Sequence, residues 1–276
     1  LRLRPQWMRE YDRWHLATDA GDQTLALSRN VKVSLQNAWL PIRAARDNSG
    51  GVHHTIFVSV GENRVPSTMN GDVVTSERNR YADRVYVLSD YAGQTIELRV
   101  NGASYDEQTR RVAGICWDPL ALLPLIENLP PGGEPLRPDV PLDSLSPVSA
   151  TRGGQPITLT PGRVSDELPL NVRGWKFEQG LAVPTESEIT YALDPSWQAF
   201  VAVIGLADGW QGAGPYELLV DDKLIWSSEK TFARNDQGRQ ILVPLPPDGK
   251  TLVLRLKGKD SVGALAHAGF VKDDAK

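Results

Sequence analysis

Residues 216–228 read YELLVDDKLIWSS, and they show most clearly a pattern that recurs along the chain. Apolar and polar side chains alternate on both sides of Asp221-Asp222-Lys223, which is typical of a tight polar turn between two strands. Successive side chains of a strand point to opposite faces. We therefore predict an antiparallel hairpin with one buried face made of Leu218, Val220, Leu224 and Trp226.

Short runs of the same kind follow one another at a spacing of roughly ten residues, with almost no helical periodicity between them. In RVYVLSDYAGQTIELRV (84–100), the turn Tyr91–Gln94 is predicted to join two antiparallel strands. The pattern predicts an all-β fold of the sandwich or jelly-roll type. Its other predicted strands are residues 24–28, 31–35, 54–60, 156–160, 188–193, 199–206, 240–245 and 251–258.

The composition agrees with many strands joined by turns. The 276 residues include 24 Gly and 20 Pro, and 41% are hydrophobic, which is enough for ordinary cores. Pro and Gly crowd together between Glu127 and Gln155, where the hydrophobic periodicity fades. We predict two tandem β-sandwich domains, residues 1–127 and 156–276, with residues 128–155 as a linker and the start of the second module.

Several function classes are disfavoured. A formal charge of −4 without a basic block argues against nucleic-acid binding, and no apolar run approaches the roughly 18 residues of a membrane span. The single Cys116 cannot form an internal disulfide and is expected to be a buried structural thiol. No nucleophile-elbow, zinc-protease, phosphate-loop or dinucleotide motif occurs, so we expect no enzyme.

The second half resembles the NPCBM family of carbohydrate-binding modules, which accompany glycoside hydrolases and are related to galactose-binding-like jelly rolls. The resemblance runs in order over residues 141–272. It rests on PLDSLSPVSATRGG (141–154), GWKFEQGLAVPTESEITYAL (174–193), FVAVIGLAD (200–208), YELLVDDKLIWSS and DSVGALAHAGFV (260–271). The chain departs from the family pattern at Pro184, where the family has His, and at His267 in the closing motif.

The first half is similar to a galactose-binding-like β-sandwich in LSDYAGQTIELRV (88–100) and CWDPLAL (116–122). Together the resemblances imply a noncatalytic pair of modules that binds a glycan outside the cytoplasm, in the extracellular space or the periplasm. They also make calcium a candidate cofactor. Because the chain opens on Leu rather than Met, we expect a mature product or a fragment of a larger protein.

A sugar ring needs an aromatic face for stacking and polar groups for its hydroxyls. Trp210 meets the first need in the loop LADGWQGAGPY (206–216), where no strand position claims its side chain. Asp208 and Gln211 flank it and are candidate polar contacts. Trp175, near a predicted turn, and His267, among small residues, complete the candidate ligand-binding set.

Each candidate also has a structural explanation. Asp208 and Gln211 suit a turn that satisfies its own backbone, and His267 suits a hydrogen-bonded structural position. An alternative function is an assembly module that packs against a catalytic or scaffold domain and binds no free sugar.

Overall fold

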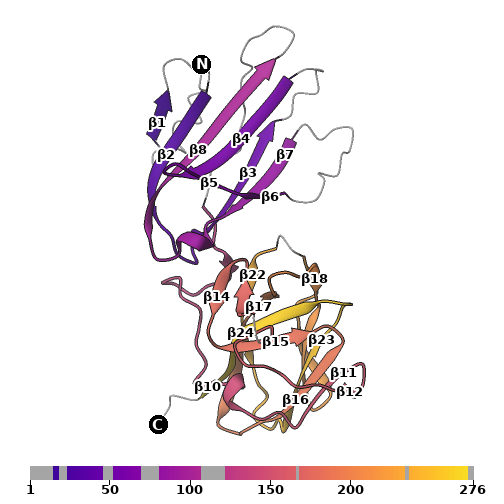
Figure 1. Ribbon diagram of the computed structural model, residues 1–276. Coiled ribbons are helices and arrows are strands. Elements are labelled where there is room, and N and C mark those ends of the chain that lie inside the picture. Colours follow the sequence, from indigo (N-terminus) through magenta and orange to yellow (C-terminus); the bar gives the residue numbers. More distant parts are fainter. Residues whose placement is uncertain are drawn as a thin grey trace. The chain divides into compact units, whose positions relative to one another are not determined.

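The computed structural model describes residues 15–18, 24–45, 52–69, 81–106, 122–165, 168–233 and 236–272. The chain divides into two compact units, Leu1–Pro124 and Leu125–Lys276, and each is described by itself (Figure 1). Strands dominate both units, which confirms the predicted all-β, two-sandwich fold. Among the described residues, no helix has the length and apolar character needed to span a bilayer.

The described residues of the first unit form two sheets. The larger has the strand order β1-β2-β8-β4-β5 and the smaller the order β3-β7-β6. Side chains from both are buried in its core, including Leu40, Val58 and Leu98. The strands are β1 (His15–Thr18), β2 (Thr24–Lys32), β3 (Trp39–Ala45), β4 (Val52–Val60), β5 (Asn63–Val65), β6 (Ser67–Met69), β7 (Tyr81–Val87) and β8 (Thr95–Asp106).

The prediction for residues 84–100 was half right. Gln94 donates its backbone N–H to the carbonyl of Tyr91, so the predicted turn exists. However, β7 pairs with β3 and β6, whereas β8 pairs with β2 and β4. The 3-10 helix Ser89–Tyr91 lies between the two strands and carries the chain from one sheet to the other, so they form no antiparallel hairpin. Cys116 lies outside the described residues.

The described residues of the second unit form two larger sheets and two short ribbons. One sheet, which we call the β17 sheet, has the order β10-β24-β17-β22-β9, with β15 also pairing with β24. The other, the β23 sheet, has the order β12-β11-β16-β23-β19-β20. Their strands are β9 (Ile126–Glu127), β10 (Val140–Pro141), β11 (Ser149–Arg152), β12 (Gln155–Pro156), β15 (Gly180–Pro184), β16 (Ser187–Ala192), β17 (Trp197–Leu206), β19 (Tyr216–Val220), β20 (Lys223–Ser227), β22 (Gly238–Pro244), β23 (Thr251–Leu256) and β24 (Val262–Lys272).

The core of this unit lies between the inner faces of the two sheets. Phe200 and Ile204 contribute from β17, while Leu218 and Leu254 contribute from the β23 sheet. The alternation that marked these strands in the sequence therefore separates a core face from an outer face. Strand β17 is buried on its outer face as well, since Val201 and Val203 are also fully buried.

Part of the predicted linker covers that outer face. Leu136 donates its backbone N–H to Gln240 Oε1 at 3.0 Å, and Gln240 Nε2 donates to the carbonyl of Ala202 at 2.9 Å. Asp139 donates its backbone N–H to the carbonyl of Phe270. The prolines and glycines of residues 128–139 thus suit a segment that crosses a sheet in close contact without adding a strand to it.

The remainder of residues 128–155 belongs to the sheets. Strand β10 pairs with β24, and β11 pairs with both β12 and β16. The change from one unit to the other is at Pro124–Leu125, before the predicted linker. Leu123 pairs with Trp39 in the first unit, whereas the carbonyl of Leu125 accepts the N–H of Gly238 in the second.

The hairpin predicted from residues 216–228 is confirmed as β19–β20. Asp221 and Asp222 have φ values of 47° and 65°, as a type I′ turn requires. Leu218 and Val220 are buried, and Trp226 packs against the same core. The prediction for Leu224 was wrong. A β-bulge between Leu218 and Leu219 shifts the register, so that Leu224 lies opposite Leu219 and is 52% exposed.

A buried tyrosine ties the two sheets of this unit together. The hydroxyl of Tyr216, in the β23 sheet, lies 2.5 Å from the carbonyl oxygen of Gly205 and 3.3 Å from that of Ala264, both in the β17 sheet. A Cβ on Gly263 would lie 2.0 Å from this hydroxyl, so the close approach requires glycine there.

We expect Tyr216→Phe to lower stability by about 1–2 kcal/mol, because the buried carbonyl of Gly205 loses the hydroxyl that donates to it. Gly263→Ala should cost about 1–3 kcal/mol through overpacking. Since part of the clash is with the hydroxyl, Gly263→Ala should be less harmful in the Tyr216→Phe background. Calorimetric unfolding of the full chain measures the two single variants and the double variant. If the two losses of stability simply add in the double variant, the methyl group at position 263 does not clash with the Tyr216 hydroxyl.

Candidate functional site

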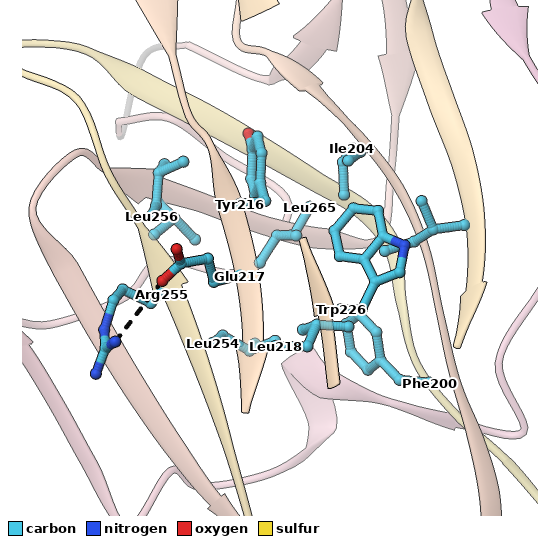
Figure 2. Close-up of a pocket in the computed structure, with 12 residues that line it drawn as sticks. Phe200, Ile204, Tyr216, Glu217, Leu218, Trp226, Leu254, Arg255, Leu256 and Leu265 are labelled. Carbon is cyan, nitrogen blue, oxygen red and sulfur yellow. Dashed lines mark ion pairs between the residues drawn. The ribbon is translucent and has the colours of Figure 1, made fainter. Parts of the chain in front are cut away.

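One cavity in the second unit is too small for a sugar. It lies between the two sheets of the second unit and holds about 10 Å³, roughly the space of one water molecule. Its walls are almost entirely apolar. Figure 2 shows Trp226 and Phe200 on one side of it and the Glu217–Arg255 ion pair on the other. This cavity cannot hold a sugar ring, whereas the surface of the unit can.

The loop after β17 presents the predicted aromatic side chain at such a surface. Trp210 is half-buried and packs against the core, and Gln211 beside it is exposed. The loop is held at both ends, because Ala207 donates its N–H to the carbonyl of Val262 and Gly212 donates to Ser261 Oγ. One part of the indole is thus fixed by packing while the rest remains accessible beside a polar amide.

Asp208 connects this loop to a hairpin 35 residues earlier in the chain. Its Oδ1 accepts the backbone N–H of Arg173 at 2.7 Å, and its Oδ2 accepts that of Gly174 at 2.6 Å. In return, the backbone N–H of Asp208 donates to the carbonyl of Asn171 at 3.0 Å. Both carboxylate oxygens therefore already accept strong hydrogen bonds from the protein.

The hairpin consists of β13 (Leu170–Val172) and β14 (Trp175–Phe177), joined by Arg173 and Gly174. Their φ values of 56° and 77° give a type I′ turn. Val172 packs so closely on the β17 sheet that a Cβ on Gly205 would lie 3.1 Å from its Cγ1. This hairpin was not predicted from the sequence. Its signal was the Arg-Gly pair between two short runs of strand-forming residues.

Trp175 is the first residue of β14, directly after the turn that Asp208 binds. It pairs with Val172 and is half-buried. The structure therefore connects Trp175 and Trp210 through only a few backbone residues and the two hydrogen bonds of Asp208. Of the five predicted residues, Trp210, Gln211, Asp208 and Trp175 thus belong to two adjoining segments.

The structure places His267 elsewhere, at the other end of the β13–β14 hairpin. Its ring lies edge-on to Phe177, with 5.3 Å between centroids, and its backbone N–H donates to Gln179. It occupies a bulge of β24 with φ 44°, and its Nδ1 is buried without a hydrogen-bond partner. Burial lowers the pKa of His267 below its ordinary 6.5, and nearby Arg137 adds to this.

The structure gives no cluster of charged side chains to which the candidate calcium ion can be assigned. Among the described residues, no group of three or more His, Cys, Asp or Glu side chains could hold a metal ion. Calcium also takes backbone and amide oxygens as ligands. Calcium therefore stays a candidate that only the family resemblance suggests.

The outer face of the β23 sheet carries charges of both signs in a row. Arg255 pairs with Glu188 at 2.7 Å and with Glu217 at 3.7 Å, and Lys257 pairs with Glu217 at 2.5 Å. The acidic and basic side chains balance one another, and Glu217 is only 11% exposed. Because its charges are already paired, this row is a weak candidate for recognising a charged ligand.

Comparison with known proteins identified one family and several solved structures. The family model described as "NPCBM/NEW2 domain" matches residues 138–274. The tandem CBM51 modules of a family 98 glycoside hydrolase from Streptococcus pneumoniae match with 16% identity and a TM-score of 0.44, covering 90% of this chain and 81% of that chain. No curated protein matches the chain.

Two other matching structures come from ZmpB of Clostridium perfringens. Its CBM51-2 and INT domains match with 17% identity and a TM-score of 0.39, covering 48% of this chain and 31% of that chain. The CBM51-2 in complex with GlcNAc, again with the INT domains, matches with 16% identity and a TM-score of 0.39, covering 61% and 36%.

The lowered pKa of His267 predicts how stability depends on pH. Its neutral form is favoured in the folded state, so its contribution is present above 6.5 and is lost as the pH falls below 6.5 toward the lower folded pKa. Asn tolerates the positive φ of this position and does not titrate. His267→Asn should therefore lose less stability than the wild type from about pH 7.5 to about pH 5. Denaturant titrations across that range measure how the free energy of unfolding of each protein depends on pH. An equal pH dependence of the variant and the wild type would contradict the assignment of this effect to His267.

Proposed function

We propose that the part of the chain that matches the NPCBM/NEW2 domain model, residues 138–274, is a noncatalytic carbohydrate-binding module. Its glycan lies against the loop after β17. The observation that carries this proposal is Trp210, an indole fixed on one side by the core and accessible beside the exposed Gln211. Stacking on the apolar face of a sugar ring with an adjacent amide for its hydroxyls fits this arrangement.

Trp175 is the second proposed contact, since the Asp208 hydrogen bonds hold its hairpin beside the loop. His267 lies at the other end of that hairpin and is left out of the proposed contact set. A surface site of this kind suits glycan chains that extend from a larger structure. We place the action of the module outside the cytoplasm, where such glycans are exposed.

Trp210→Ala should weaken glycan binding by about 1 kcal/mol or more, which is roughly fivefold, because the stacking surface is lost. Trp210→Phe should retain most of the affinity. Leu224→Ala is the matched control, since Leu224 is an exposed apolar side chain beside the β19–β20 turn and outside this loop. A glycan array identifies the strongest ligand of the wild type, and calorimetric titration with that glycan compares the variants.

Two outcomes would overturn the proposal. If the wild type binds no glycan on the array and no monosaccharide at millimolar concentration, the assembly role becomes the better account of the module. If a glycan binds but Trp210→Ala and Leu224→Ala retain equal affinity, the site lies elsewhere on the unit.

A further inference from the structure

Asp208 binds the backbone of another segment through both of its carboxylate oxygens. Oδ1 accepts the N–H of Arg173 at 2.7 Å, and Oδ2 accepts the N–H of Gly174 at 2.6 Å. Hydrogen bonds to a charged acceptor are stronger than those between neutral groups. These two bonds give Asp208 a structural role that is independent of any contact with a ligand.

The same bonds link the two backbone segments that carry the proposed aromatic contacts. Trp210 is two residues after Asp208, and Trp175 directly follows Gly174, whose N–H binds Oδ2. The return bond from Asp208 N–H to the carbonyl of Asn171 adds a third attachment. The hairpin itself is only three residues long on each side, too short to hold its turn in place unaided.

We propose that Asp208 is a positioning residue that clamps the β13–β14 hairpin to the loop after β17 and so holds Trp175 and Trp210 in one binding surface. This inference rests on the proposed glycan site. Asp208 contributes to affinity without touching the ligand. Flexible loops lower the affinity of a shallow site, because they must be ordered each time a ligand binds.

The chain supplies a matched control for this clamp. Asp221 also joins two separate segments through its carboxylate, accepting the N–H groups of Lys250 and Thr251 and the hydroxyl of Thr251. It lies at the far end of β19 from Tyr216, next to Val220, and so away from the loop after β17. Asp208→Asn and Asp221→Asn therefore make the same chemical change in two similar clamps, only one of which adjoins the tryptophans.

We expect both variants to lose thermal stability, but only Asp208→Asn to lose affinity, by tenfold or more, for the glycan that gives the strongest wild-type signal on the array. Titration is done at a temperature where both variants are fully folded. Hydrogen exchange at the amides of Arg173 and Gly174 should accelerate in Asp208→Asn and stay unchanged in Asp221→Asn. Acrylamide quenching of tryptophan fluorescence should rise in Asp208→Asn alone.

Equal affinity of Asp208→Asn and the wild type would overturn the positioning role, and so would equal affinity loss in both variants. Unchanged exchange at residues 173–174 in Asp208→Asn would show that the clamp does not hold the turn. If the wild type binds no glycan, the proposed function fails, and exchange and quenching alone then decide whether Asp208 couples the two segments.

Discussion

The hydroxyl of Tyr216 joins the two large sheets of the second unit close to the strand ends that adjoin the loop after β17. Its acceptors are Gly205, near the end of β17, and Ala264, near the start of β24. The loop that carries Trp210 begins two residues after Gly205 and is anchored to Val262 of β24. Tyr216 also begins β19, shortly after that loop ends. The Tyr216 hydroxyl holds the ends of β17, β19 and β24 at a fixed spacing. That spacing determines the positions of both ends of the loop.

The close packing around Tyr216 requires two glycines as well as the hydroxyl. Glycine at position 263 allows the tyrosine to enter, and glycine at position 205 allows Val172 of the β13–β14 hairpin to approach the other face of β17. Strand β17 is consequently packed on both faces, with the hydroxyl on one side and the hairpin on the other. Close packing from both sides leaves the loop after β17 little freedom to shift as a whole.

Alternation of apolar and polar residues was sufficient to predict the all-β fold and the β19–β20 hairpin, because it follows directly from strand geometry. It was insufficient for Leu224, since a bulge changes the register without changing the composition of the strand. It also failed for residues 84–100. A turn signal shows where the chain bends, but not whether the next strand stays in the same sheet.

The Pro- and Gly-rich stretch shows a related difficulty. Its composition is typical of linkers. Residues 133–138 instead run against the β17 sheet, where the Gln240 side chain bonds the backbone of Leu136. What distinguishes such a segment from a linker is a partner more than a hundred residues away, here Gln240. Local composition contains no information about that partner.

The candidate site could be predicted only in part, because local composition reveals some of its residues and not their distant partners. An aromatic residue in a glycine-rich loop is a local signal, and it led to Trp210 and its neighbours. The role of Asp208 depends on the turn at Arg173–Gly174, which two positive φ values shape to present adjacent N–H groups. Sequence alone indicated that Asp208 was a turn residue or a sugar contact. Its bonds across 35 residues favour a structural link between two segments.

These features bear on how the proposed carbohydrate-binding module would recognise a glycan. The cavity between its two sheets has room for about one water molecule, so the proposed function uses side chains at the surface. A half-buried tryptophan suits this purpose, because its packed part limits rotation while its accessible part remains available for stacking. In that proposal, Gln211 and the main chain supply polar contacts to the sugar hydroxyls, and the two hydrogen bonds of Asp208 hold the neighbouring turn in place. A site built from an indole and an amide would select ligands by the shape and hydroxyl pattern of the sugar.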